Sequence, residues 1–256
     1  MSGKALRLRK LFPTTDHRLF AVPLDHSLTM GPIAGLERLG PLSARLQEGG
    51  VSALIVHKGA VRTIESTLWP QTLLGIHLAA STTLSGDASH KHRAGTVAEA
   101  VRLGADFIST QVNFGVSSEG NMLADLGSLS EEANALGMPL LVMAYVKAKG
   151  REYDAEAVAH ACRASADLGA DIVKTSFTGR ETFSRVVSSV DVPVLVGGGQ
   201  KLESRADLLQ LVRDSIECGA RGICIGRNLF QNPDVTAVCQ QVGALLHPAA
   251  LVPAPK

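Results

Sequence analysis

A lysine at the end of an apolar run is the residue around which we expect chemistry. Lys174 follows Ile172 and Val173 and precedes two small hydroxyl residues, Thr175 and Ser176. Lysine is rarely buried without a partner or a purpose. Burial disfavours the ammonium form, and the neutral amine is a nucleophile for carbonyl carbons. The segment therefore predicts a Schiff base with a ketone. The alternative is a lysine whose ammonium reaches water or pairs with a carboxylate.

Two further polar side chains directly follow apolar runs and are candidates for proton transfer. Asp25 follows Leu24, where a carboxylate can pair with a lysine, position a hydroxyl or move protons. It can equally cap the next turn. Tyr145 follows Ala144, and a phenol beside an amine can act as an acid or a base in carbinolamine and enamine steps. The alternative is an ordinary rim tyrosine. We expect Lys58 to neutralise charge in the same pocket or to pair with Asp25.

Three histidines, His26, His57 and His77, also lie where apolar runs end. Each stands alone there, without the spacing or the supporting carboxylate of a zinc site. We therefore expect no metal, and because an imine is itself an electron sink, no other cofactor. We expect His26 to face the substrate.

The elements that must position these residues alternate along the chain. Apolar runs without polar alternation indicate strands that are covered on both faces. We expect strands at 19–24, 52–56, 72–78, 106–110, 139–144, 171–176, 192–196 and 222–226. We expect helices at 4–12, 36–48, 60–68, 95–103, 121–136, 154–168, 180–190, 203–218 and 233–245, with Asp154 as an N-cap.

Eight strands that alternate with helices in 256 residues predict an α/β fold, a single-domain (β/α)8 TIM barrel. An open doubly wound sheet is the alternative, but no G-x-G-x-x-G follows the first strand. The helix-ending sequence LGAD occurs at 103–106 and at 168–171, which indicates a repeated βα unit. We expect an N-terminal extension with a short helix at 1–18, the barrel at 19–247 and a flexible tail at 248–256.

The loops after the seventh and eighth strands often bind phosphate in such barrels. Here they contain Gly197, Gly198 and Gly199, and then Gly226 and Arg227. Glycine lets the backbone approach an anion closely, and a guanidinium suits bidentate contact. Together they predict a phosphorylated ligand. A phosphorylated ketone that forms an imine with Lys174 can yield an enamine that adds to an aldehyde, or undergo the reverse cleavage.

Composition narrows the class of protein. Hydrophobic residues make up 45%, charged residues 19% and aromatic residues 4%, with a formal net charge of +1. These values predict a sizeable core and argue against nucleic-acid binding. No signal segment or membrane span is expected, so we expect a cytoplasmic protein. The cysteines lack metal or C-x-x-C spacing and are expected to be small buried residues in a reducing compartment: Cys162, Cys218, Cys224 and Cys239.

Four segments resemble motifs of the archaeal-type class I fructose-bisphosphate aldolases, in the right order over nearly the whole chain: VPLDHS at 22–27 followed by GP at 31–32, IVKT at 172–175, PVLVGGG at 193–199 and GRNLFQ at 226–231. The resemblance implies a (β/α)8 fold with Lys174 as the imine former and Tyr145 and Asp25 as its proton-transfer partners. It also implies small-molecule phosphoketone and aldehyde substrates and a ring-like homo-oligomer, a decamer.

Other segments look similar to one secondary-metabolism branch of this family: LRLRKL at 6–11, RLF at 18–20, VHKG at 56–59 and HLAAST at 77–82. That branch joins dihydroxyacetone phosphate to aspartate semialdehyde, on the way to 3-amino-4-hydroxybenzoate. One departure leaves the acceptor open. The family follows its tyrosine with Pro-Arg-Gly, whereas Tyr145 precedes Val146 and Lys147. Lys147 keeps a positive charge for substrate binding without the guanidinium fork.

Three alternatives therefore stand beside a synthase of this branch. The first is a fructose-bisphosphate aldolase, and the second is a transaldolase-like or thiolase-like enzyme acting on another phosphoketone. The third is an inactive barrel that serves as a phosphosugar-binding or assembly subunit. Lys174, Tyr145 and Asp25 together argue against the third. Neither the direction of the reaction nor its stereochemistry follows from the sequence.

Overall fold

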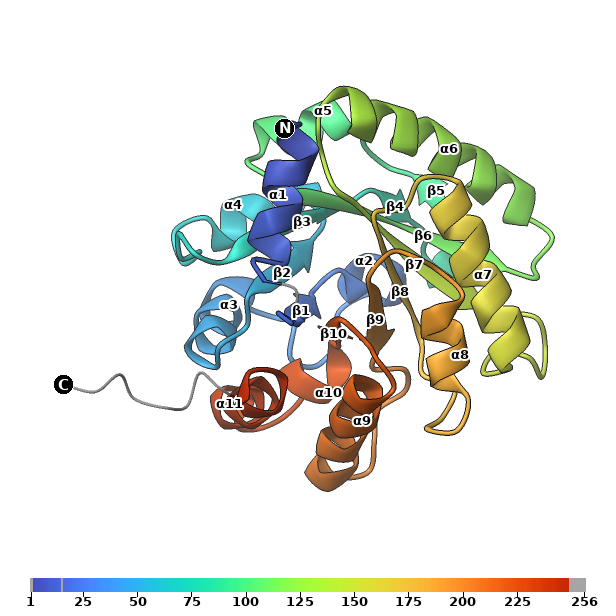
Figure 1. Cartoon of the computed structure of the whole chain (residues 1–256). Helices are drawn as coiled ribbons and strands as arrows, with labels where there is room; N and C mark the ends of the chain where they lie inside the picture. The colour runs from blue at the N-terminus through green and yellow to red at the C-terminus, as the bar shows by residue number, and fades with distance from the viewer. Residues whose placement is uncertain (1, 15, 249–256) are drawn as a thin grey trace.

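The computed structural model of the chain describes residues 2–14 and 16–248. Eight parallel strands close into a barrel in the order β1-β10-β9-β8-β7-β6-β3-β2, which confirms the predicted fold class (Figure 1). These strands are β1 (Leu19–Pro23), β2 (Ala53–Val56), β3 (Leu73–His77), β6 (Phe107–Phe114), β7 (Leu140–Val146), β8 (Ile172–Ser176), β9 (Val194–Gly197) and β10 (Gly222–Cys224).

The helices surround the barrel, and each predicted helix has a counterpart (Figure 1). Asp154 caps its helix as expected, since its carboxylate accepts a hydrogen bond from the Ala157 N–H at 3.0 Å. The outer helices are α3 (Leu39–Glu48), α4 (Val61–Ile64) after the 3-10 turn η1 (Lys58–Ala60), α5 (Val97–Arg102), α6 (Glu119–Ala135), α7 (Ala155–Asp167), α8 (Phe183–Ser188), α9 (Arg205–Glu217) and α11 (Val235–Leu246).

Three elements lie in segments for which the sequence predicts no structure. Helix α2 (His26–Met30) follows β1, and helix α10 (Arg227–Phe230) follows β10. After β3, strand β4 (Ala79–Ala80) pairs antiparallel with β5 (His92–Arg93) around the turn η2 (Thr83–Ser85), forming a hairpin. All three begin at or near the carboxyl end of a barrel strand, where they surround the mouth of the barrel.

Strand β6 is longer than predicted. The predicted strand ends at residue 110, but Asn113 still lies inside β6 and pairs in register with Tyr145 of β7. Its side-chain amide donates to the Ser89 carbonyl at 2.6 Å and so fastens the hairpin segment to the barrel. The polar residues Gln111 and Asn113 hide this extension from a search for apolar runs.

Helix α1 (Gly3–Leu11) lies across one end of the barrel, in front of the strands in Figure 1. Leu11 is fully buried, and Leu8 and Phe12 pack against the inward-facing side chains of the strands. The predicted short helix that packs on the domain therefore forms, and its apolar face covers the interior at the amino ends of the strands.

The repeated LGAD sequences share one structural role. Asp106 and Asp171 each accept a hydrogen bond from a backbone N–H at the start of a neighbouring strand, at 3.0 Å from Leu74, the second residue of β3, and 2.8 Å from Leu140, the first residue of β7. Each also pairs with a lysine of α1. Lys10 lies 3.4 Å from Asp106, and Lys4 lies 2.8 Å from Asp171. The repeat therefore joins the helix-to-strand turns to the helix that covers the barrel.

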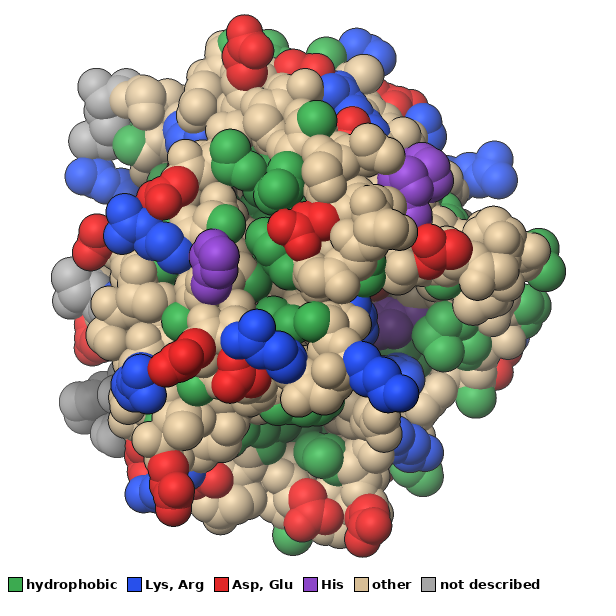
Figure 2. Space-filling model, turned by 90° about the vertical axis from the view of Figure 1, so that its right-hand side faces the viewer, with side chains coloured by type: hydrophobic (Ala, Val, Ile, Leu, Met, Phe, Trp, Pro, Cys, Tyr) green, Lys and Arg blue, Asp and Glu red, His purple; other side chains and the backbone are tan. Residues whose placement is uncertain are grey.

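One expectation about the cysteines is not met. Cys218 is only partly buried, whereas the other three cysteines are buried as expected. The expected tail at 248–256 lies, from residue 249 on, outside the described residues. Acidic and basic side chains are intermixed on the face in Figure 2, in keeping with a net charge of +1. No helix within the described ranges has the length and apolarity needed to cross a membrane.

Replacing Asp171 by alanine is expected to lower the free energy of unfolding by about 1–3 kcal/mol, because the buried Leu140 N–H loses its side-chain acceptor. Urea unfolding followed by circular dichroism measures this. Asp167→Ala is the matched control, since Asp167 forms only an exposed pair with Arg163. That pair is worth about 0.3–0.5 kcal/mol. Equal losses of unfolding free energy in the two variants would show that the hydrogen bond from the Leu140 N–H to Asp171 does not stabilise the barrel.

Candidate active site

The two-residue period of the strands aims Lys174 into the barrel. In β8, Ile172 belongs to the interior cluster, Val173 belongs to the layer between strands and helices, and Lys174 again points inward. The same alternation in β7 brings Met143 and then Tyr145 to the interior. The strand-end positions predicted from the sequence therefore converge for a simple geometric reason.

These side chains line a cavity of about 500 Å³ at the carboxyl ends of the strands. Most of the residues predicted to form the site belong to its lining: Asp25, His26, Tyr145, Lys147, Lys174, Gly198, Gly199, Gly226 and Arg227. His57 and His77, which also lie where apolar runs end, line it as well. The described residues contain no group of three or more His, Cys, Asp or Glu side chains arranged to hold a metal ion.

Lys174 is 5% exposed, and its Nζ lies 3.7 Å from Met143 Sδ and 5.8 Å from the centre of the Tyr145 ring. Burial lowers its pKa, but the negative charges that Cys224, Tyr145 and Asp25 carry when ionised raise it, and the net direction is upward. The expectation that burial favours the neutral amine is therefore wrong for the free protein. Lys174 rests as an ammonium and must lose a proton before it can attack a carbonyl.

Tyr145 and Cys224 surround this ammonium as neutral groups. Burial raises the pKa of the Tyr145 phenol and of the Cys224 thiol, and Lys174 opposes both shifts. Gly197 explains how closely the group packs. A Cβ at residue 197 would lie 2.9 Å from Tyr145 Oη and 3.3 Å from Lys174 Cε. We had expected Gly197 to line the cavity. Instead, it leaves room for the lysine and the phenol.

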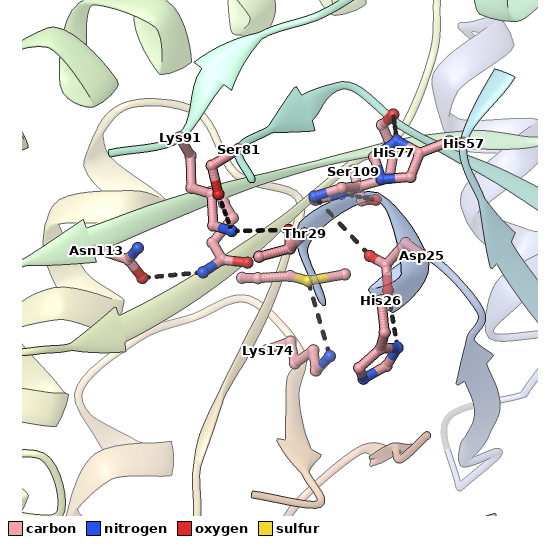
Figure 3. A network of polar contacts seen from close by, with 12 residues as sticks. Asp25, His26, Thr29, His57, His77, Ser81, Lys91, Ser109, Asn113 and Lys174 are labelled. Carbon is pink, nitrogen blue, oxygen red and sulfur yellow. Dashed lines mark hydrogen bonds and ion pairs between the residues drawn. The ribbon is translucent and has the colours of Figure 1, made fainter. Parts of the chain in front are cut away.

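Asp25 is the carboxylate of the site. Burial raises its pKa, but His77, His26 and Lys174 lower it, so that it falls to about 2. His26 Nδ1 lies 3.3 Å from one oxygen, and His77 Nε2 lies 3.9 Å from the other (Figure 3). Asp25 is therefore ionised at neutral pH and can accept a proton.

His77 joins Asp25 to the wall of the barrel. Burial lowers the pKa of His77 to about 3, although Asp25 opposes the shift. Because its imidazole is then neutral at pH 7, the positive charge of Lys174 favours the ionised form of Asp25 there. His77 Nδ1 lies 2.8 Å from Ser109 Oγ, and the His77 carbonyl lies 3.2 Å from His57 Nδ1. The first contact fixes the orientation of the His77 ring beside the carboxylate, and the second fixes that of the His57 ring.

The glycine loops after β9 and β10 are held together by two neighbouring side chains. Arg227 Nη2 donates to the Gly199 carbonyl at 2.7 Å, and Asn228 Nδ2 donates to the Gly198 carbonyl at 3.0 Å. Gly199 has φ +59°, which a side chain would disfavour. Gly226 packs under His26, where a Cβ would lie 2.7 Å from the ring. The structure therefore places these glycines and a guanidinium together on one side of the cavity.

One predicted site residue lies elsewhere. Lys58 is half-exposed and pairs with Glu99 at 3.0 Å, outside the cavity lining. The expectation that it neutralises charge in the pocket or pairs with Asp25 is wrong. Lys58 follows β2 within the turn η1, which carries its side chain outward to the acidic first turn of α5.

The sequence analysis also missed residues that line the cavity. Lys91 lies on the hairpin after β3, Gln111 lies in the unpredicted extension of β6, and Glu152 lies in the loop after β7. None of them ends an apolar run. The interruption of the βα repeat by the long segment between β3 and α5 was the only signal in the sequence that pointed to Lys91.

Comparisons with known proteins agree with this geometry. A model of the DeoC/LacD family aldolases matches residues 19–232. The chain is 36% identical over 248 residues to a 2-amino-4,5-dihydroxy-6-oxo-7-(phosphonooxy)heptanoate synthase of Streptomyces griseus, covering 96% of this chain and 90% of that protein. It is also 36% identical to a 2-amino-3,7-dideoxy-D-threo-hept-6-ulosonate synthase of Halobacterium salinarum, covering 96% of this chain and 92% of that protein.

Solved structures give the same result. The crystal structure of an archaeal fructose 1,6-bisphosphate aldolase matches with a TM-score of 0.85 and 27% identity, covering 96% of this chain and all of that one (100%). A second archaeal structure has its catalytic lysine bound to the carbinolamine intermediate of the substrate. It matches with a TM-score of 0.85 and 26% identity, covering 95% of this chain and 99% of that one.

Gly197→Ala is expected to lower catalytic turnover by about 10- to 100-fold, because the new methyl group displaces the Tyr145 hydroxyl and the Lys174 side chain. Steady-state kinetics and circular dichroism together test this. Gly120→Ala is the control, since a Cβ there meets open space. Unchanged turnover in a folded Gly197→Ala protein would show that the close approach has no catalytic consequence.

Proposed function

Because this chain belongs to the DeoC/LacD family of aldolases, we propose that Lys174 forms a Schiff base with dihydroxyacetone phosphate and that the enzyme joins this donor to an aldehyde. The observation that carries the proposal is the buried Lys174 amine in one cavity with the Asp25 carboxylate and the Tyr145 phenol. The fold, the aldolase class and the formation or cleavage of a carbon–carbon bond follow from the family. The substrates and the roles of individual residues are our proposal.

The donor phosphate binds at the loops after β9 and β10. Gly198, Gly199 and Gly226 allow the backbone N–H groups to approach an anion, and Arg227 adds a fixed positive charge. These loops flank Lys174, which lies on the strand next to β9. A three-carbon ketone phosphate can therefore bind there with its carbonyl carbon beside the amine.

Imine formation begins with removal of a proton from the Lys174 ammonium. The amine then attacks the ketone carbon, and the carbinolamine loses water as its hydroxyl is protonated. The neutral Tyr145 phenol is placed to supply and recover protons at this oxygen, because its hydroxyl packs beside the Lys174 side chain. The product is a protonated imine on Lys174 and one molecule of water.

Carbon–carbon bond formation follows from the protonated imine. A base removes a proton from the carbon next to the imine carbon, and the electron pair of that C–H bond forms the enamine. The enamine carbon attacks the aldehyde carbon, whose oxygen takes up a proton, and water then releases the ketone product from Lys174. Asp25 is a carboxylate at neutral pH and Tyr145 is a phenol, so one accepts and the other donates a proton.

The Streptomyces griseus relative is named after its product, and the structure of that product indicates which aldehyde is the acceptor. In a 4,5-dihydroxy-6-oxo chain, an aldol disconnection breaks the bond between carbons 4 and 5. It leaves a ketone phosphate from carbons 5 to 7 and a 2-amino-4-oxobutanoate, which is aspartate semialdehyde. We propose this acceptor for the present enzyme, with Lys147 among the residues that bind it. A cytoplasmic location and a ring-like decamer remain predictions.

Borohydride reduction in the presence of dihydroxyacetone phosphate is expected to leave an adduct on Lys174. Intact mass should rise by the mass of the donor less one oxygen atom, and peptide mapping should place the addition at residue 174. Lys174→Met should give no adduct and no turnover while it remains folded. An adduct formed only with fructose 1,6-bisphosphate would change the donor, and no adduct with either ketone would contradict the Schiff-base mechanism.

Arg227→Ala is expected to raise KM for dihydroxyacetone phosphate by about 10- to 100-fold, the cost of losing hydrogen bonds to a charged group. KM for unphosphorylated dihydroxyacetone should change little. Arg227→Lys keeps the positive charge but lacks the guanidinium fork, so its KM for dihydroxyacetone phosphate should lie between those of the wild type and Arg227→Ala. Equal losses for both ketones would show that the phosphate binds elsewhere.

A further inference from the structure

We infer that Lys91 forms an anion-binding subsite for the acceptor, on the side of the cavity opposite the donor phosphate. The inference rests on the proposed function, because it assigns the second substrate of the same site. In the closed order of the barrel, β3 lies directly across from β9. Lys91 belongs to the hairpin after β3, whereas the glycine loop follows β9. The two loops therefore reach the cavity from opposite walls.

The surroundings of Lys91 are those of a cation held ready for a ligand. Its side chain is buried (8% exposed), and its Nζ donates to Ser81 Oγ at 2.7 Å and to Thr29 Oγ1 at 3.2 Å (Figure 3). Both partners are neutral hydroxyls. A buried ammonium is costly unless an anion compensates it. Among the described residues these two hydroxyls are the acceptors of the ammonium, which leaves its third N–H for a ligand in the cavity that Lys91 lines.

A second cation reaches the same region. Lys147, at the end of β7, lines the cavity, with its Nζ 5.7 Å from the centre of the Tyr145 ring. Burial lowers the pKa of Lys91, Asp25 opposes this shift, and the positive charge of Lys147 adds to it. A bound anion would offset both the burial of Lys91 and the repulsion that the charge of Lys147 exerts on it.

The position of Lys91 relative to Lys174 defines the ligand. Figure 3 shows Lys91, Asp25 and Lys174 approaching one space from three different segments of the chain. A donor held by its phosphate on the β9 side directs its reacting carbon toward the β3 side. The ligand at Lys91 is therefore the far end of a short aldehyde, and its chemical class is a carboxylate or a phosphate.

Steady-state kinetics with dihydroxyacetone phosphate as donor and three acceptors test the subsite. Propanal has no charge, succinic semialdehyde carries a carboxylate, and glyceraldehyde 3-phosphate carries a phosphate. Lys91→Met is expected to raise KM for one or both anionic acceptors by about 10- to 100-fold and to change KM for propanal by less than about twofold. The anionic acceptor that responds identifies the group, and Lys91→Arg should restore part of the loss.

The matched control is Lys149→Met, because Lys149 is an exposed lysine of the neighbouring loop and lies outside the cavity lining. It should leave all three KM values unchanged. Equal increases for propanal and for both anionic acceptors in Lys91→Met would show that Lys91 only holds the hairpin in place. No increase for any acceptor would also overturn the subsite.

A binding measurement tests the Lys91 subsite without relying on the proposal that dihydroxyacetone phosphate is the donor. Succinate, an unreactive dicarboxylate, is titrated in ligand-observed NMR experiments, which require no turnover. Its affinity is expected to fall by about tenfold or more in Lys91→Met and to remain unchanged in Lys149→Met. Equal affinities in wild type and Lys91→Met, together with unchanged KM for glyceraldehyde 3-phosphate, would overturn the subsite even where borohydride traps the donor on Lys174. A missing adduct with normal succinate discrimination would instead overturn only the donor mechanism.

Discussion

The Lys174 amine is buried in a barrel interior that is otherwise lined, toward the amino ends of the strands, by apolar side chains. The arrangement of the site follows from that burial. The lysine lies in the layer above Ile172, close to Met143, and a charge at such a depth requires compensation. Asp25 supplies the opposite charge, while Tyr145 and Cys224 surround the lysine as neutral groups. The attraction between these two charges favours the ionised form of both groups, so Lys174 and Asp25 influence each other's protonation.

This mutual dependence explains the glycine and the histidines around the pair. A side chain at Gly197 would separate the phenol from the lysine, and a side chain at Gly226 would displace His26 from Asp25. His77, held by Ser109, stands against the second carboxylate oxygen without competing as a cation. Lys174 and Tyr145 lie on the adjoining strands β8 and β7, and Asp25 lies in the turn directly after β1, so the barrel itself sets the separation of the three groups.

The sequence predicts those parts of the molecule that follow from the periodicity of apolar residues. It does not predict segments whose position depends on contacts between residues far apart in the chain. Apolar runs give all eight strands, and their ends give Lys174, Tyr145 and Asp25. The hairpin that carries Lys91 has no apolar run, because Ser81, Thr29 and the Met122 sulfur hold it in place instead. In the sequence Lys58 and Tyr145 both come where an apolar run ends, but Tyr145 lies inside β7, whereas Lys58 pairs with Glu99 on α5, a partner that the local sequence does not reveal.

The two sides of the cavity are built from different kinds of structure. The loops after β9 and β10 are cross-linked by Arg227 and Asn228, so the wall proposed to bind the donor phosphate is held by contacts within itself. The opposite side combines the β4–β5 hairpin with the loop after Tyr145, where Lys147 replaces the arginine expected from the family resemblance. Changes in these two segments leave the lysine, the phenol and the carboxylate in place. One Schiff-base centre can therefore serve enzymes that share a ketone donor and differ in the aldehyde they accept.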